Sequence, residues 1–166
     1  MALTNAYKNK IVDSLTGNSA LLIANSVSSG SSVPDVTMKI GLAYIDQTKS
    51  GPEEEGYFVE PSGNGYSRAI IGNTKQPDTR VFPTASNGKA TNNKHIYFTE
   101  ATGPWANGAE LTHFVIYSTY SNNTTLVAYA LLRNDQGAAA PVKVENKNTV
   151  VLFRPEALTI EYTDVV

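Results

Sequence analysis

Residues 36–44 alternate between apolar side chains and polar or small ones, with a period of two. Such a period places every second side chain on one face of a β-strand. Alternating or short apolar segments recur along the rest of the chain at 66–71, 95–100, 111–120, 124–133, 142–144, 149–153 and 157–162. About seven or eight strands separated by turns predict an all-β fold, an antiparallel β-sandwich that is jelly-roll-like.

One segment near the N-terminus has a helical period instead. Apolar residues recur at every fourth position in Leu3, Tyr7, Ile11 and Leu15. This spacing predicts a short N-terminal α-helix over residues 3–16, with Gly17 as the residue that ends it. A helix of this length is marginal alone, so its apolar stripe is expected to pack on the chain's own sheet or on a neighbouring subunit.

Two apolar runs in the second half of the chain are nearly continuous, LVAYALL at 126–132 and VVLF at 150–153. Strands of this kind are typically covered on both faces, here by the helix, by a second sheet or by another chain. A polar turn at 121–123 separates the first run from the strand before it and predicts a β-hairpin.

The stretch VEPSGNGYSRAIIG, residues 59–72, contains three glycines and raises the question of a nucleotide-binding loop. Such loops need a strand, then glycines, then a helix whose N-terminus faces the phosphates. Here the glycines precede a strand, and no Lys-Ser or Lys-Thr pair follows them. Residues 62–65 are therefore predicted to form a turn in which Gly or Asn adopts a positive φ angle.

Composition limits the class of protein further. The chain has 166 residues, a formal net charge of −2 and no cysteine. One domain over 1–166 is expected, with a polar excursion at 73–94. The charge gives no attraction to nucleic acid or anionic lipid, and no apolar run reaches the about 18 residues of a membrane span. Because the N-terminus lacks the apolar segment of a secretion signal, the chain is expected to be soluble and made in the cytoplasm.

Candidate catalytic groups are few. His95 and His113 would approach each other if their strands paired. A carboxylate, Glu100 or Glu110, would then complete a zinc or hydrolytic site. No metal-ligand spacing supports this arrangement, and a cross-strand or surface histidine is the ordinary case. The acidic run 53–55 is expected to be a solvated loop tip, because adjacent carboxylates in a loop mostly diverge into water.

Other catalytic patterns are equally weak. No G-x-S-x-G elbow for a serine nucleophile occurs. A carboxylate pair for glycoside hydrolysis, for example Asp46 and Glu60, cannot be placed across a cleft from the sequence. We therefore assign no catalytic, cofactor-binding or metal-ligating residue.

Trp105, the single tryptophan, lies in a loop with Gly103, Pro104 and Gly108. It could stack on a sugar ring, as in carbohydrate-binding β-sandwiches, or plug the open end of the core, which is the favoured interpretation. Tyrosines are frequent as well, and they suit either half-buried sheet positions or a contact surface. Those in or near predicted strands and turns are Tyr57, Tyr66, Tyr97, Tyr117, Tyr120 and Tyr129.

The order of four segments is more informative than any one of them. They are VEPSGNGYSRAIIG, IYFTEATGPWANGAELTHFVIYST, TTLVAYALL and VVLFRPEALTIEY. This order resembles a group of small virion proteins of tailed bacteriophages and prophages, the tail-fibre-like or minor structural proteins. The resemblance covers most of residues 3–162, and its matching positions are 60–68, 98–105, 112–117 and 153–160. An enlarged excursion at 73–94 and a longer tryptophan loop depart from the pattern.

The resemblance implies a non-enzymatic virion structural protein, part of a tail-fibre-like appendage or a capsid decoration. Its expected partners are other virion proteins of the tail or capsid, and the chain is expected to be a homo-oligomer. No cofactor, nucleic acid or membrane insertion is implied. Arg68 is expected to tie the bend at 60–65 to a neighbouring loop. The alternative is a carbohydrate-binding module that recognises a host surface glycan through Trp105 and nearby tyrosines.

Overall fold

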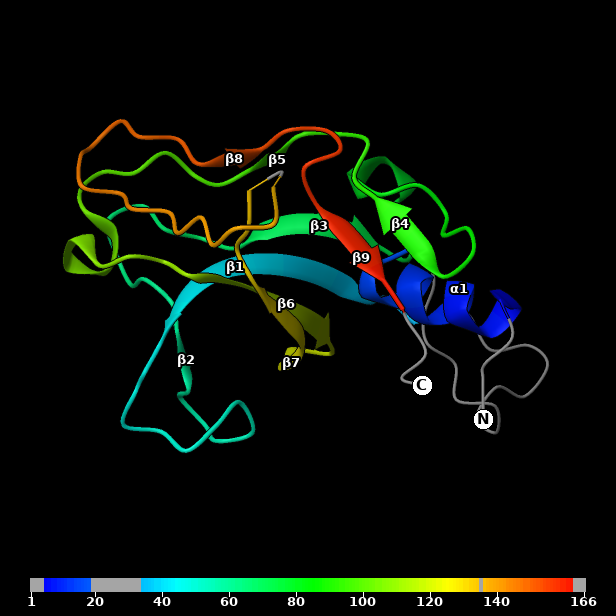
Figure 1. Cartoon of the computed structure of the whole chain (residues 1–166). Coiled ribbons are helices and arrows are strands. Elements are labelled where there is room, and N and C mark those ends of the chain that lie inside the picture. The colour runs from blue at the N-terminus through cyan, green and yellow to red at the C-terminus, as the bar shows by residue number, and fades with distance from the viewer. Residues whose placement is uncertain (1–4, 19–33, 135, 163–166) are drawn as a thin grey trace.

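The computed structural model describes residues 5–18 (side chains from Lys8 onward), 34–134 and 136–162 (Figure 1). This part of the chain contains one α-helix, α1 (Asn5–Leu15), and two 3-10 helices, η1 (Pro77–Thr79) and η2 (Trp105–Gly108). Its strands are β1 (Thr37–Ile45), β2 (Phe58–Val59), β3 (Ala69–Asn73), β4 (Lys89–Thr91), β5 (Ile96–Tyr97), β6 (His113–Tyr120), β7 (Asn123–Leu131), β8 (Leu152–Phe153) and β9 (Thr159–Glu161).

β1 is the central strand of the main sheet and pairs antiparallel with three others. On one side it pairs with β6, so that Ile40 lies opposite Ile116. On the other side β3 pairs with the first half of β1, and β2 pairs with its last two residues. β7 extends the sheet beyond β6. The sheet is curled, so that its inner face forms half of a barrel.

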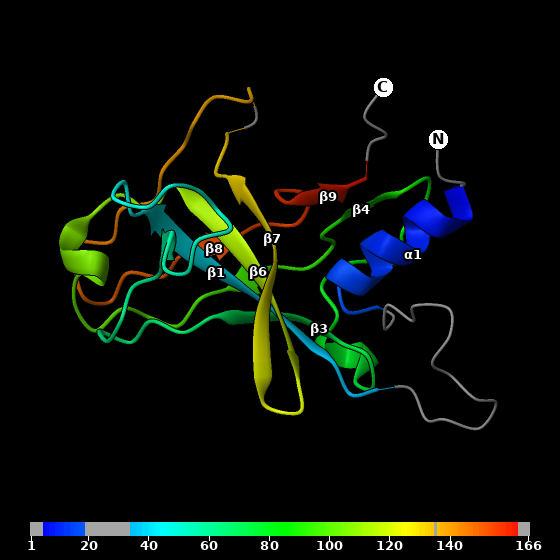
Figure 2. The same cartoon turned by 90° about the horizontal axis from the view of Figure 1, so that it is seen from below.

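Two short antiparallel ribbons, β4–β9 and β5–β8, face the inner side of this curl (Figure 2). The mostly-β class and the N-terminal helix predicted from the sequence are confirmed. The sandwich or jelly-roll arrangement is not confirmed, because in the described residues the second layer consists of separate two-stranded ribbons rather than a continuous sheet.

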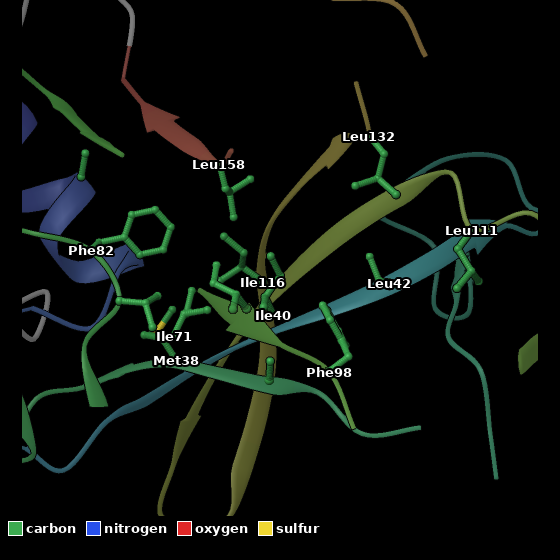
Figure 3. Packing of buried hydrophobic residues seen from close by; sticks show 14 of the residues in the cluster. Met38, Ile40, Leu42, Ile71, Phe82, Phe98, Leu111, Ile116, Leu132 and Leu158 are labelled. Atoms are coloured by element: carbon green, nitrogen blue, oxygen red, sulfur yellow. The ribbon is translucent and has the colours of Figure 1, made fainter. Parts of the chain in front are cut away.

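One cluster of buried hydrophobic side chains fills the half-barrel. Alternate residues of β1 point into it, as their period of two predicted. Figure 3 shows side chains from β1, β3 and β6 meeting in the centre, with side chains from the ribbons and loops around them. The labelled members are Met38, Ile40, Leu42, Ile71, Phe82, Phe98, Leu111, Ile116, Leu132 and Leu158.

Helix α1 ends as predicted. Gly17 adopts a left-handed conformation with φ +76°. The Asn18 N–H then donates to the Asp13 carbonyl at 2.8 Å, which is the hydrogen bond of a Schellman motif. A Cβ on Gly17 would lie 2.6 Å from the carbonyl carbon of Gly72 in β3, so the same glycine also permits a close approach of the helix end to the sheet.

The helix packs on its own chain, but with a different face from the predicted one. Val12 and Thr16 are fully buried, whereas Ile11 and Leu15 of the predicted stripe are only half-buried. Polar side chains reinforce this contact, since Asp13 Oδ1 accepts a hydrogen bond from the Ala85 N–H at 2.6 Å. Leu3 and the Tyr7 side chain, which complete the predicted stripe, lie outside the described residues.

The predicted hairpin is confirmed as β6 and β7. Tyr120 pairs with Asn123, and the two residues between them, Ser121 and Asn122, have φ angles of +46° and +68°. Two successive positive φ angles are the signature of a type I′ turn, whose twist suits adjoining strands. Figure 2 shows this turn extending beyond the neighbouring elements.

The polar excursion at 73–94 contains η1 and β4. Its apolar pair, Val81 and Phe82, is buried in the core cluster. Asn92 is also fully buried and holds a distant segment, because its amide donates to the Arg154 carbonyl and accepts from the Leu158 N–H, both at 2.8 Å. The segment therefore closes the end of the half-barrel beside α1.

Candidate functional site

The turn at 62–65 and the loop that contains Trp105 pack together. Gly63, Asn64 and Gly65 all have positive φ angles, which confirms the predicted turn. The Asn64 carbonyl accepts hydrogen bonds from the Thr102 N–H at 2.9 Å and from the Trp105 Nε1–H at 3.0 Å. The Asn64 side-chain amide donates to the carbonyl of the residue before Trp105 at 2.6 Å. One left-handed asparagine thus joins the two loops.

Trp105 closes one end of the core. Its side chain is 1% exposed and packs edge-on against Tyr66, with 5.1 Å between ring centroids. Phe98 lies on another side of the indole at 6.4 Å. The interpretation of Trp105 as a plug is confirmed. A buried indole cannot stack on a sugar, so the carbohydrate-binding alternative loses the residue on which it depended.

Glu60 and Arg68 form an ion pair at the base of the same turn. Arg68 Nη2 and Nε lie 2.5 and 2.8 Å from Glu60 Oε2. The guanidinium also lies over the ring of Tyr117 in β6, with 3.5 Å between Cζ and the ring centroid. The prediction that Arg68 ties the bend at 60–65 to a neighbouring loop is therefore wrong, because its partner is Glu60 in the same bend. Arg68 closes its own bend and fastens it to the outer face of the main sheet.

Tyr66 completes this cluster by sealing a gap in the sheet. β3 stops pairing with β1 at Ile40 and β2 begins at Tyr44, which leaves Leu42 between them. The Tyr66 hydroxyl accepts a hydrogen bond from the Leu42 N–H at 2.9 Å and donates to Glu60 Oε1 at 2.6 Å. A side-chain oxygen thus replaces the missing strand, as a buried backbone N–H requires.

Electrostatics fix the charge state of this cluster, which consists of Glu60, Tyr66, Arg68 and Tyr117. Burial, aided by the Glu60 carboxylate, raises the pKa of Tyr117 to about 12. The same causes raise the pKa of Tyr66 well above its ordinary value. Burial opposes the charge of Arg68, but its hydrogen bond and attraction to Glu60 outweigh burial and raise the pKa. At neutral pH both phenols stay neutral beside a fixed ion pair, which suits a structural role.

The two histidines do not come together as a site. β5, which follows His95, pairs with β8, whereas β6, which begins with His113, pairs with β1 and β7. His95 is exposed and stacks on Tyr97, and burial lowers the pKa of His113. The strand pairing on which the hydrolytic hypothesis depended is therefore wrong. The described residues contain no group of three or more acidic or histidine side chains that could hold a metal ion.

The other candidate carboxylates have local partners. Glu53, Glu54 and Glu55 are exposed, and Glu54 accepts hydrogen bonds from the Ser50 N–H at 2.8 Å and Lys49 Nζ at 3.0 Å. These contacts, the Ser50 one first, lower the pKa of Glu54. The prediction of a solvated loop tip is confirmed. Of the two carboxylates named as an example for glycoside hydrolysis, Asp46 accepts a hydrogen bond from Thr48, and Glu60 is held by Arg68.

Apolar side chains are exposed along β7. Val127 and Tyr129 are 40% and 45% exposed, and Tyr120 at the hairpin turn is 53% exposed. The cover predicted for both faces of LVAYALL is only partial in the described part of this chain. Ala128 packs against the core, and Phe58 of β2 lies against Tyr129 with 4.5 Å between ring centroids. A second exposed group, Tyr97, Val150 and Leu152, lies on and beside the β5–β8 ribbon.

A polar groove of about 550 Å³ lies beside the β6–β7 turn. It runs between that turn, the first half of β1 and η1, and one exposed tyrosine, Tyr120, stands at its side. The rest of the lining is mainly hydroxyl, amide and charged side chains, among them Asp35, Thr37, Lys39, Gln76, Thr79 and Asn122.

Sequence comparison agrees with a structural role. The described helices include none that is long and apolar enough to cross a membrane. The described side chains of the site hold two loops together, and a family profile shows the class of protein, a bacteriophage virion structural protein. The profile described as Podophage GP4 fiber I protein gp80 matches residues 2–143, and the chain belongs to this family. No curated protein and no solved structure matched the chain.

This membership confirms the resemblance to tail-fibre-like virion proteins of tailed bacteriophages. The family is one of structural proteins, and its members are components of the virion. The matched residues end before β8 and β9, so the exposed group on the β5–β8 ribbon lies partly outside the match, whereas all of β7 lies inside it.

Proposed function

We propose that this chain is a component of a fibre on the tail of a podophage virion, not a capsid decoration. The observation that carries this proposal is the family match over residues 2–143, because that family is described as a fibre protein. The chemistry of the site supports it, since the most elaborate side-chain cluster, Glu60, Tyr66, Arg68 and Tyr117, holds a turn and presents no reactive group.

The physical role is display by a rigid support. The curled sheet and its single core fix the positions of the loops, and the Asn64 contacts lock the two loops at one end. At the other end, the β6–β7 turn and the polar groove remain accessible. A fibre needs this division between a fixed scaffold and exposed contact surfaces, because loops act in binding only when a scaffold holds them.

Electron microscopy of purified virions tests this proposal. An antibody raised against the isolated protein and coupled to gold should mark the tail or its appendages. Gold over the capsid faces or vertices, with none at the tail, would contradict a fibre and favour capsid decoration. Virions from a phage that lacks this gene product serve as the control for antibody specificity.

A second candidate function, saccharide binding, is favoured by the polar groove. Hydroxyl, amide and carboxylate groups with one exposed aromatic ring are the groups that bind neutral sugars. Calorimetry with polysaccharide from the host surface should then give a saturable heat that Tyr120→Ala removes. Tyr97→Ala is the matched control, because Tyr97 is also exposed but lies on a different sheet. A wild-type protein that gives no saturable heat excludes this function.

A further inference from the structure

We propose that the polar groove beside the β6–β7 turn binds an acidic saccharide, one of whose carboxylate groups lies against the ammonium group of Lys39. This inference rests on the saccharide-binding function proposed above and adds the charge of the ligand to it. The neutral units of the same polymer contact the hydroxyl, amide and aromatic groups of the groove, and one acidic unit occupies the position beside Lys39.

Lys39 places a positive charge in the groove. It lies in the first half of β1, opposite Ile70 of β3 and Tyr117 of β6. Its neighbours along the strand, Met38 and Ile40, point into the core (Figure 3). Successive side chains of a strand point to opposite faces, so Lys39 lies on the outer face of the sheet. Its side chain is half-buried and lines the groove.

The charge of Lys39 is not neutralised by the described part of the chain. No carboxylate among these residues forms an ion pair with it. Arg68, another cation on this face, is already paired with Glu60. Asp35 also lines the groove, but its Oδ1 accepts a hydrogen bond from Asn73 Nδ2 at 2.8 Å. An anionic ligand would therefore supply the partner that Lys39 lacks, since a partly desolvated charge is stabilised by an opposite one.

A buried asparagine fixes one wall of the groove. Asn73 is 5% exposed, and its amide nitrogen donates to Asp35 Oδ1 and Thr37 Oγ1, both at 2.8 Å. Its amide oxygen accepts from the N–H groups of Lys75 and Gln76 at 2.7 and 3.0 Å. These four contacts hold the wall in place before any ligand arrives, so binding does not have to order it.

The groove also offers groups that are not used by the fold. The side-chain amides of Gln76 and Asn122 and the Ser121 hydroxyl make no hydrogen bond with the residues that the structure describes. Two apolar side chains of the lining are accessible as well, Ile70 at 49% and Tyr120 at 53% exposed. Hydrogen-bonding groups next to apolar surface suit a sugar, which has hydroxyls at its edge and C–H groups on its faces.

A single ammonium group favours a carboxylate over a phosphate as the anionic group of the ligand. Phosphates are typically bound by arginine forks or by several N–H groups at a helix N-terminus. Among the described residues that line the groove there is no arginine, and η1 beside it has only three residues. Lys39 offers one positive charge, with the Asp35 carboxylate nearby in the same groove. A singly charged uronic acid unit therefore matches this site better than a doubly charged phosphate.

Calorimetry with two forms of one polymer tests the proposal. Polysaccharide purified from the host surface is compared with the same polysaccharide after its carboxyl groups are reduced to alcohols. Wild-type protein should bind the native form about tenfold more tightly, because only that form pairs with Lys39. Lys39→Met should abolish this preference, and Lys39→Arg should keep it. The preference of the wild type should shrink at high salt, which screens the ion pair.

Lys75→Met is the matched control. Lys75 is exposed and lies next to Gln76, but it does not line the groove, so this variant should keep the preference for the native polymer. Circular dichroism verifies that the variants are folded. Loss of the preference in Lys75→Met would mean that the general charge of the surface causes it, which would overturn the role of Lys39.

The outcomes separate this inference from the function on which it rests. If wild-type protein binds both forms equally, or if Lys39→Met keeps the preference, the acidic ligand at Lys39 is wrong while saccharide binding stands. If neither form gives a saturable heat, saccharide binding itself fails, and the acidic ligand fails with it. None of these results bears on whether gold labels the tail, so the fibre proposal is tested separately.

Discussion

The main sheet is bounded by β3 and β2 on one side and by β7 on the other, and the protein treats the two sides in opposite ways. Between β3 and β2, the Leu42 N–H of β1 has no strand partner, and the Tyr66 hydroxyl accepts its hydrogen bond, with the Glu60–Arg68 pair behind it. On the other side, no described segment of the chain pairs with the outer edge of β7, and Val127 and Tyr129 remain partly exposed.

The comparison separates an edge that the chain closes itself from an edge that it leaves to solvent. Sealing the β1 edge requires buried hydrogen bonds and a desolvated ion pair, because unpaired backbone groups at that depth are costly. The β7 edge is accessible to water, which satisfies its backbone in the free chain. An edge of this kind remains open at low cost until a partner strand replaces the water.

The largest effect expected on the closed side comes from Trp105. Trp105→Ala should lower the free energy of unfolding by about 3–5 kcal/mol, because it leaves a cavity and removes one of the two donors to the Asn64 carbonyl. Urea denaturation measures the change. Tyr97→Ala, which removes an exposed ring, should change stability little. Equal losses in the two variants would contradict the assignment of Trp105 as the plug of the core.

Breaking the Glu60–Arg68 ion pair should have the next largest effect on the free energy of unfolding. Glu60→Ala leaves Arg68 unpaired on the face of Tyr117 and removes the acceptor of Tyr66, which should cost about 2–3 kcal/mol. The loss stays below that of a wholly buried pair because the Arg68 side chain is 31% exposed. The exposed pair Lys143–Glu145 provides the control, and Glu145→Ala should leave the melting temperature unchanged.

The Tyr66 hydroxyl should contribute less to the free energy of unfolding. Tyr66→Phe keeps the ring against Trp105 but leaves the Leu42 N–H without its acceptor, at a cost of about 1–2 kcal/mol. Hydrogen exchange gives a local measurement, because the amide of Leu42 should lose protection while that of a β6 residue should keep it. An unchanged rate at Leu42 would mean that the gap is sealed by something other than Tyr66.

The smallest effect concerns alkaline pH. The folded pKa of Tyr117 is raised to about 12 from a value of 10.0, so the folded state holds a proton that the unfolded state releases first. Below pH 10 both states are protonated and stability does not depend on this group. Between pH 10 and about 12 the free energy of unfolding should fall as pH rises. Tyr117→Phe should reduce that slope, and pH-dependent urea denaturation measures it.

Several elements could be predicted because their signals lie within a few neighbouring residues. The period of two in β1, the polar turn of the β6–β7 hairpin and the glycine that ends α1 each needed only local sequence. β2 and β4 were not predicted, because β4 lies inside the polar excursion and β2 lies between two turn segments, where no alternation marks a strand. Tyr66 and Glu60 belong to the turn motif at 59–72, but no sequence signal places them at the gap between β3 and β2.

Helix α1 shows a further limit of prediction from the sequence, because its docking face was not the predicted one. The i+4 stripe was correct as a helical signal, yet the chain buries Val12 and Thr16, and polar Asp13 makes one of the contacts. Which face docks depends on the surface that receives it, here the backbone of 85–88 and the close approach at Gly72. Those residues are more than 50 positions away in sequence.

The sequence by itself determined the strands with long alternation, the turns and the kind of protein, because periodicity, turn chemistry and motif order are properties of neighbouring residues. Only the tertiary structure decided that Arg68 pairs with Glu60, that the two histidines stay apart, and that Trp105 is buried while the outer edge of β7 has no partner strand among the described residues. These outcomes depend on which distant strands meet, and the energy of such a meeting is shared among residues that no local pattern connects.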